Sequence, residues 1–474
     1  SWGASMPGLA PSTRRFRFTE KWRLANRGLT PIHLFWGLTS ILFAFNAAAE
    51  DLMQVYRDAQ RYDAVYSAAR QTLAAGRERL PQGRALLLPT LNLSANAQRA
   101  RVESDSRDPS VTPSFNRDPR TLGYTVTFAQ PLYRPQNYLQ YKQSELQVMQ
   151  AEANFAQAGQ DLIVRTAQAY FDVLAALDTL EVVRAQKAAT GEQLAAAKRN
   201  FEVGTATITD THEAQSRFDL IGAQEIAALN DLQSKHQALQ LIAGKAYKEL
   251  KGLRPEVKLA PPNPENMESW VELSEKQGYP VQTAEAGAEI AALEARRQRA
   301  GHLPTLDAVA TYGQTGQTAS STSTASATGA DVTTATIGLQ FAIPLYQGGA
   351  ISSREREAAA LSLKSRDDLE NARRTAAVST RQNYLLVING ISAIAALEQA
   401  LISSQSSLDS NKLGYEVGVR INIDVLNAQQ QLFSTRRDLA VARYNTIVNQ
   451  LKLKSLAASL REEDLEEVNR VLGP

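Results

Sequence analysis

The sequence predicts an α+β membrane protein in which several chains together close a β-barrel that continues into long helices. Three observations lead to this fold class: motifs that recur about 214 residues apart, four strand-length segments with alternating apolar residues, and Pro-free helical stretches of up to almost seventy residues. A repeat this long indicates two copies of one structural unit.

The internal two-fold repeat is visible in several separate motifs. Each half contains Leu-Pro-Thr-Leu, then Pro-Leu-Tyr, then Val-Gly followed by an Asp and by Ala-Gln. The first copies are residues 88–91, 131–133, 203–204, 210 and 214–215, and the second copies are residues 303–306, 344–346, 417–418, 424 and 428–429. We therefore expect one structural repeat in residues 50–260 and a second in residues 261–474.

The N-terminal segment and the composition limit the function classes. Residues 1–49 combine a basic region, a short apolar core and a small-residue end, which predicts a secretory signal peptide and a mature chain starting near Glu50. An N-terminal membrane anchor is the alternative, but the apolar run is short for it. We expect no helical membrane span after residue 49.

A net charge of +2 gives no reason to expect nucleic-acid binding, and the absence of Cys excludes disulfides, thiolate metal sites and a lipid-anchored mature N-terminus.

Each half begins with a helix and a pair of strands. A helix is expected over residues 51–84, and strand pairs are expected in about residues 90–132 and 305–345. Leu122, Tyr124, Val126 and Phe128 show the period of two that is typical of a sheet with two different faces. The Ser/Thr/Ala/Gly tract at residues 314–331 predicts an exposed loop.

Four strands of roughly 12 residues suit a tilted crossing of a bilayer. A spanning sheet must close because its edges find no water in lipid, and four strands are too few to close alone. Because an eight-stranded barrel is filled by side chains, a pore requires at least three chains and 12 strands. The alternative is a four-stranded soluble sandwich.

Long helices follow each strand pair, at residues 135–201 and 210–246 and again at 352–415 and 424–460. The longest would span on the order of 100 Å. The last helix carries a heptad seam, and its additional apolar residues predict neighbours on both sides; ordinary bundle packing is the alternative. The seam residues are Val425, Leu432, Leu439, Thr446, Leu453 and Leu460, and the additional ones are Phe433, Ile447 and Val448. The Pro-rich residues 244–280 predict a small mixed connector, and residues 461–467 predict a solvated helical tail.

The chain resembles the TolC-like outer-membrane efflux and secretion proteins over nearly all of residues 50–460. The resemblance rests on the Leu-Pro-Thr-Leu strand starts, on the motifs at residues 130–133 and 343–349, and above all on residues 414–428 and 442–451. It implies a homotrimer with a 12-stranded barrel in the outer membrane, an α-helical tunnel across the periplasm and an equatorial region around it. Pro131 and Pro344 correspond to the barrel–tunnel junction, where a residue without N–H suits a strand end.

The resemblance also implies a gate at the periplasmic tip, where Gly204 and Gly418 form the helical turns. The gate positions that carry over are Thr209, Asp210, Tyr415, Arg420, Asp424 and Asn427. In this assignment Tyr415 and Arg420 form a hydrogen-bonding latch, and Asp424 forms a carboxylate ring that holds cations. Asn427 stands where a family member has a second Asp, so cation block should be weaker. Helix capping is the alternative for Asp210 and Asp424, and both roles are compatible.

The resemblance implies a passive exit duct without cofactor or metal. Its implied partners are a periplasmic adaptor (membrane fusion protein), an inner-membrane ABC transporter or other pump, outer-membrane lipid and secreted protein cargo. Within the family the chain is similar to type I secretion channels, including those that export an adenylate cyclase toxin; multidrug efflux is the alternative. A structural periplasmic coiled-coil adaptor would explain the helices but not the strands. An enzyme is disfavoured because His212, His236 and His302 form no catalytic pattern.

Overall fold

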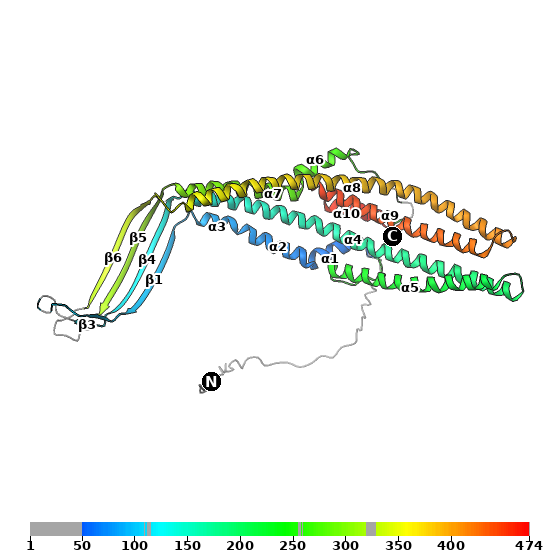
Figure 1. Ribbon diagram of the computed structural model, residues 1–474, viewed down its shortest axis with the longest axis horizontal. Helices are drawn as coiled ribbons and strands as arrows, with labels where there is room; N and C mark the ends of the chain where they lie inside the picture. The colour runs from blue at the N-terminus through cyan, green and yellow to red at the C-terminus, as the bar shows by residue number, and fades with distance from the viewer. Residues whose placement is uncertain are drawn as a thin grey trace, which may run out of the picture. The chain divides into compact units, whose positions relative to one another are not determined.

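The computed structural model describes residues 50–108, 110, 115–254, 257, 259–318 and 329–473. The predicted signal peptide at residues 1–49 lies outside these residues. All the elements described below belong to one unit, Ala48–Pro474. Figure 1 shows that in this unit a β-sheet lies at one end and that the long helices run away from it.

The sheet contains the four predicted strands, all antiparallel, in the order β1-β4-β5-β6. They are β1 (Thr90–Arg99), β4 (Arg120–Tyr133), β5 (Thr305–Thr318) and β6 (Ala330–Ala342). The short strands β2 (Val102–Ser104) and β3 (Phe115–Arg117) extend the first hairpin beyond β1 and β4, within the strand pair expected over residues 90–132. Both ends of the loop expected over residues 314–331 are strand instead, because β5 continues to Thr318 and β6 begins at Ala330; residues 319–328 of this loop lie outside the described residues.

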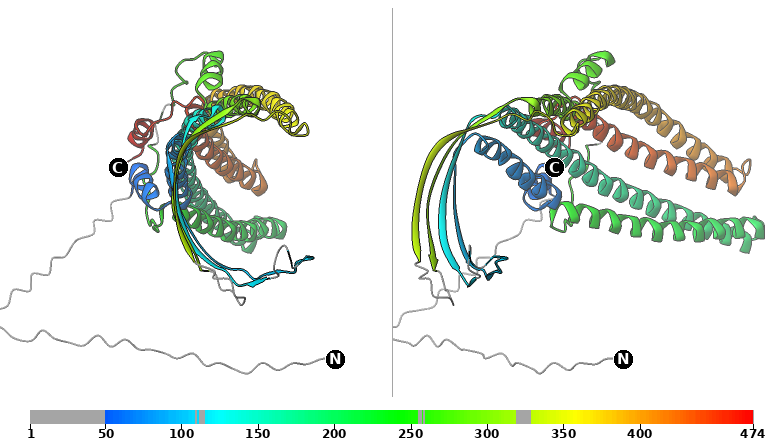
Figure 2. Two further views of the ribbon diagram at one scale, coloured as in Figure 1. Left: turned by 90° about the vertical axis from the view of Figure 1, so that its left-hand side faces the viewer. Right: turned by 60° about the vertical axis from the view of Figure 1, so that its left-hand side comes forward.

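The sheet is curved and has two open edges. Among the described residues, β1 and β6 each pair with a neighbouring strand on one side only. Figure 2 shows that the sheet bends strongly and that the long helices lie along the continuation of its arc. The pairing of β4 with β5 joins the strands of the two halves of the chain into this one curved sheet.

Two long helical hairpins form the rest of this layer. The first consists of α4 (Pro135–Glu202) and α5 (Ile208–Ala243), and the second consists of α8 (Ala350–Glu416) and α9 (Asn422–Leu456). α9 contacts both α8 and α4, as its additional apolar residues predict. All six predicted seam residues and Phe433, Ile447 and Val448 are buried, although α9 ends before Leu460.

The N-terminal helix is divided into α1 (Leu52–Tyr62), α2 (Ala64–Arg77) and α3 (Arg79–Ala85), so the single helix predicted over residues 51–84 is wrong. Asp63 causes the first break because its carboxylate accepts a hydrogen bond from the Tyr66 N–H at 2.6 Å. The same carboxylate binds Arg165 at 3.0 Å. Burial alone would raise the pKa of Asp63, but these two partners together hold this pKa below its ordinary value.

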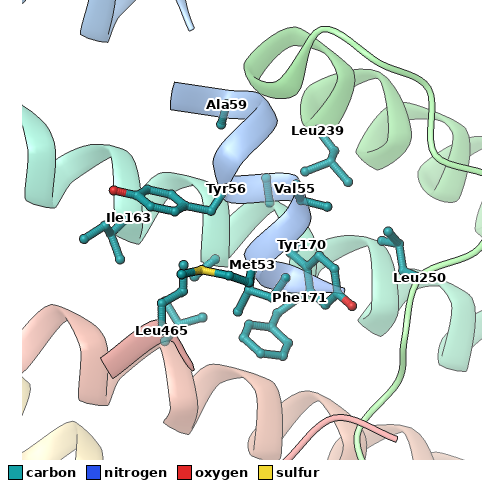
Figure 3. Packing of buried hydrophobic residues seen from close by; sticks show 14 of the residues in the cluster. Met53, Val55, Tyr56, Ala59, Ile163, Tyr170, Phe171, Leu239, Leu250 and Leu465 are labelled. Atoms are coloured by element: carbon teal, nitrogen blue, oxygen red, sulfur yellow. The ribbon is translucent and has the colours of Figure 1, made fainter. Parts of the chain in front are cut away.

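The largest apolar core surrounds α1 at the middle of the helical layer. Residues of α1 pack against α4, α5, α9 and α10 (Glu462–Arg470), and Figure 3 shows Met53, Tyr170, Phe171 and Leu465 in this cluster. The Tyr170 hydroxyl donates to the Lys251 carbonyl at 2.8 Å. Leu465 is fully buried, so the C-terminal segment is helical as predicted but docks on the core rather than being wholly solvated.

The connector between the halves is mixed, as predicted. It contains α6 (Met267–Gln277) and two isolated β-bridges, which join Leu250 to Glu50 and Leu253 to Leu472. These bridges attach both ends of the described chain to the core around α1. The helix α7 (Tyr279–Arg299) and the 3-10 turn η1 (Ala300–His302) then lead into β5.

One described helix, α8, is long and apolar enough to cross a membrane by length and composition, which corrects the expectation that no such segment follows residue 49. Its most apolar 18-residue window has a mean hydropathy of 1.8, and 11% of that window is buried within the chain. An exposed apolar stripe that packs against a second chain would give the same result, so this observation alone does not define a membrane span.

Candidate functional site: the tips of the two helical hairpins

The two hairpin tips share one backbone turn. Gly204 and Gly418 have φ values of 79° and 81°, a region that glycine enters without steric cost. In the first tip the N–H groups of Thr205 and Ala206 both donate to the Asn200 carbonyl, at 2.8 and 3.2 Å. In the second tip the corresponding N–H groups donate to the Gly414 carbonyl at 2.9 and 3.0 Å. Both predicted tip glycines therefore occupy equivalent turns.

The first tip completes its own helix start. Thr207 is the N-cap of α5, and its side chain accepts a hydrogen bond from the Asp210 N–H at 3.3 Å. The Asp210 carboxylate in return accepts from the Thr207 N–H at 2.9 Å, which forms a capping box. The capping alternative is thus realised at Asp210. Thr209 lies beside it and is exposed.

The second tip lacks this cap. Ile421 occupies the N-cap position of α9 and has no side chain that accepts a hydrogen bond. Asp424 forms an ion pair with Arg420 at 3.7 Å, with about one-third of its side chain exposed. Gly414 makes room for Arg420, because a Cβ atom at Gly414 would lie 2.6 Å from the Arg420 Cγ. Asp424 and Arg420 are therefore adjacent, but they stay within one hairpin.

Hydrogen bonds from the first hairpin hold the second tip. Asn422 is fully buried, accepts a hydrogen bond from Gln193 of α4 and donates to the Asp210 carbonyl at 3.4 Å. The Asn200 side chain donates to the Tyr415 hydroxyl at 3.3 Å. Of the two predicted latch residues, Tyr415 thus joins the hairpins, whereas the described ion pair of Arg420 does not.

Arg217 of α5 forms a second bridge, to Asn427 and Gln430 of α9. Its guanidinium donates to the Asn427 Oδ1 at 3.0 Å and to the Gln430 Oε1 at 2.5 Å. Sequence analysis did not select Arg217, Asn200, Gln193 or Asn422. Amide side chains are frequent in both hairpins, and the sequence does not distinguish the few that lie between helices. An arginine or asparagine on a helix also gives no sign of its partner about 200 residues away.

The two junction prolines lie where the sheet meets the helices. Pro131 is in a register irregularity between β4 and β5, and Pro344 follows the end of β6 by two residues. Next to Pro131, the Arg134 guanidinium binds the Asp307 carboxylate of β5 through Nε at 2.8 Å and Nη2 at 2.5 Å. Gly348 and Gly349, both at positive φ, lead from Pro344 into α8.

A curved, open four-stranded sheet that continues into long helical hairpins defines a class of outer-membrane channel components. The model of the family described as "Outer membrane efflux protein" matches residues 55–245 and 273–459. The chain belongs to this family.

Sequence relatives agree with this family. The chain is 33% identical to the outer membrane protein TolC of Vibrio cholerae, over 89% of this chain and 93% of the relative. It is 31% identical to the proteases secretion protein PrtF of Dickeya chrysanthemi, over 89% of this chain and 91% of the relative.

Solved structures share the fold. The channel CusC has a TM-score of 0.73 at 15% identity and covers 86% of this chain and 92% of its own. The outer membrane protein VceC of Vibrio cholerae has a TM-score of 0.70 at 19% identity and covers 86% of this chain and 96% of its own. The chain is therefore an outer-membrane exit duct that extends into the periplasm, and it is not an enzyme.

Proposed function

We propose that three copies of the chain form a 12-stranded barrel and a continuous helical tunnel, which serve as the exit duct of a type I protein secretion system. The observation that carries this proposal is the open, curved sheet with unpaired edges at β1 and β6 among the described residues. Such edges have no hydrogen-bonding partners in a membrane, so they require strands from other copies. Three copies supply the smallest number of strands that leaves a passage.

The lipid-facing surface supports the same assembly. Large apolar side chains stand exposed at alternate positions of the strands, as expected for a barrel whose outer face meets hydrocarbon. They include Leu91, Leu93, Leu122, Ile337, Leu339 and Phe341, with exposed fractions from 64 to 90%. The strands β4 and β5 have 14 residues each, which is enough for a tilted crossing.

The helical layer also exposes apolar surface that one chain does not cover. On α8 this surface is formed by Leu361, Leu363, Val378, Leu385, Leu386, Ile402 and Leu413. On α5 it is formed by Leu220, Ile226, Leu229 and Leu241. α5 and α8 lie at the two outer positions of the helical layer, since α4 and α9 contact each other between them. Packing of α8 against α5 of a neighbouring copy would bury both surfaces and close the tunnel.

The proposed cargo is a protein toxin, and the proposed partners are a periplasmic adaptor and an inner-membrane ABC transporter. Two relatives carry secretion in their names: PrtF, and the alkaline protease secretion protein AprF of Pseudomonas aeruginosa, which is 30% identical over 91% of this chain. Export of small molecules through another pump is the second candidate, favoured by the family description and by the 24% identical outer membrane efflux protein BepC of Brucella suis.

The hairpin tips are the proposed gate of this duct. Thr209 and Asp210 would stay with the capped first tip, while Tyr415, Arg420, Asp424 and Asn427 belong to the second tip, which depends on bonds from its neighbour. Opening would break the contact of Tyr415 with Asn200 and the contacts of Asn422. Three copies of Asp424 would form a carboxylate ring at the constriction.

Two experiments test the proposed function. The purified chain should have three times the chain mass in detergent and should conduct ions in a planar bilayer; a monomer without conductance would contradict the duct.

Deletion of the gene should remove specific proteins from the culture medium, and a plasmid copy should restore them. If the medium is unchanged while small toxic compounds accumulate in the cells, the efflux alternative is correct.

A further inference from the structure

Arg217 places a positive charge beside the predicted carboxylate ring. It belongs to α5, but both of its side-chain hydrogen bonds go to α9, to Asn427 at 3.0 Å and to Gln430 at 2.5 Å. Both acceptors are neutral amides, and no ion pair of Arg217 occurs among the described residues. The guanidinium is therefore held in place without being neutralised.

The position of this charge along α9 is defined by its acceptors. Asn427 follows Asp424 by three residues, which places it on the same side of the helix and about 4.5 Å further along the axis. Asn427 and Gln430 are exposed, and Arg217 is half-buried between α5 and α9. The guanidinium bonds to residues three and six positions after Asp424, which is about 4.5 and 9 Å along the helix axis and therefore comparable to the Debye length of about 8 Å at physiological salt.

We propose that Arg217 is a selectivity-determining residue of the gate, which offsets the Asp424 ring and makes the constriction less cation-selective than that ring alone would be. This inference rests on the proposed function, because it requires that the tip lines a pore. Asn427 contributes by accepting the hydrogen bond that aims the guanidinium. An aspartate at position 427 would pair with Arg217 instead of presenting a free carboxylate to the pore.

The test is the reversal potential of wild-type and variant trimers in a planar bilayer under a KCl gradient. Arg217→Gln removes the charge and should raise the cation-to-anion permeability ratio about twofold or more. Arg217→Lys keeps the charge while losing the two-pronged hydrogen bonding, and it should leave the ratio close to that of wild type.

Arg437→Gln is the matched control. Arg437 is exposed on α9 ten residues beyond Asn427, or about 15 Å along the axis, and it pairs with Asp438 at 2.9 Å. Screening over this distance should leave the permeability ratio unchanged. A shift equal to that of Arg217→Gln would show that any lost arginine has this effect and would overturn the inference.

A double-mutant cycle tests the role of Asn427. Asn427→Ala removes the acceptor that aims the guanidinium without adding a charge, so it should raise the permeability ratio in the wild-type background and change it little together with Arg217→Gln; the two effects are then non-additive. Additive effects, or a reversal potential that does not respond to Arg217→Gln, would overturn the inference while leaving a conducting duct intact. A wild-type trimer that conducts no ions would overturn the proposed function and this inference together.

Discussion

The two hairpin tips have the same backbone turn but stabilise their helix starts by different means. The first tip uses its own Thr207–Asp210 capping box. The second has Ile421 at the N-cap position and relies on Asn422, which bonds to the first hairpin. The capping box of the first tip does not depend on the second hairpin, so the first tip can keep its structure if the hairpins separate. The second tip loses the bonds of Asn422 in that case and can be released. From this difference we propose that the second hairpin is the moving part of the gate.

The largest expected effect comes from removing the buried amide of the second tip. Asn422→Ala leaves the Gln193 side-chain amide without this acceptor and removes the bond to the Asp210 carbonyl, which should lower the free energy of unfolding by about 1–3 kcal/mol and raise single-channel conductance. Ile208 is the matched control, since it occupies the equivalent position of the first tip and is 46% exposed. Equal effects of Asn422→Ala and Ile208→Ala would contradict the difference between the tips.

The shared turn predicts equal costs at its two glycines. Gly204→Ala and Gly418→Ala each force an L-residue to positive φ, which should cost roughly 1–2 kcal/mol. Nothing lies within 4 Å of the Cβ position at either glycine, so contacts add no further cost. Denaturation of the two variants measures this; a large inequality would show that the turns are not equivalent.

Exchanging the caps should reduce the difference between the tips. Thr207→Ala removes the N-cap of α5 and should lower the free energy of unfolding by about 1 kcal/mol. Ile421→Thr supplies an N-cap to α9 and should stabilise its first turn by a similar amount, which would also lower the open probability of the channel. Bilayer recordings check the second effect, and an open probability that rises would argue against the assignment of the moving hairpin.

The smallest effect on stability is expected for the two predicted latch residues, Tyr415 and Arg420. Arg420 and Asp424 are partly exposed and 3.7 Å apart, so their ion pair contributes about 0–1 kcal/mol. Tyr415→Phe removes the hydroxyl that accepts from Asn200. The double variant with Arg420→Ser should nevertheless increase conductance, because it removes contacts made at the tip. Unchanged conductance would exclude this pair from the gate.

Periodic patterns predicted much of the fold, because burial repeats along a helix or a strand. The seam residues of α9 from Val425 to Leu453 are buried as their heptad spacing predicts, and the alternation at residues 122–128 coincides with β4. Single residues that end an element were harder to interpret. Asp63 breaks a good helical pattern through one side-chain hydrogen bond and one ion pair, and periodicity does not register such a cap.

The structure of the hairpin tips, where we propose the gate, could be predicted only in part. The turn glycines and Asp424 stand in recognisable motifs, so the sequence located both tips. The contacts between the hairpins depend on which of many amide side chains lie between helices, and Asn422 shows no sequence feature that marks it as buried. The burial of Leu465 was not predicted for a related reason, because acidic residues flank it on both sides in the sequence.

The central claim is that the second tip opens while the first stays folded. Hydrogen exchange of the purified trimer, followed by mass spectrometry of peptides that cover residues 203–214 and 417–428, compares the tips directly. Faster exchange at the start of α9 than at the start of α5, with a further increase in Asn422→Ala confined to the second peptide, is the predicted result. Equal exchange in both peptides, or faster exchange in the first, would contradict the claim.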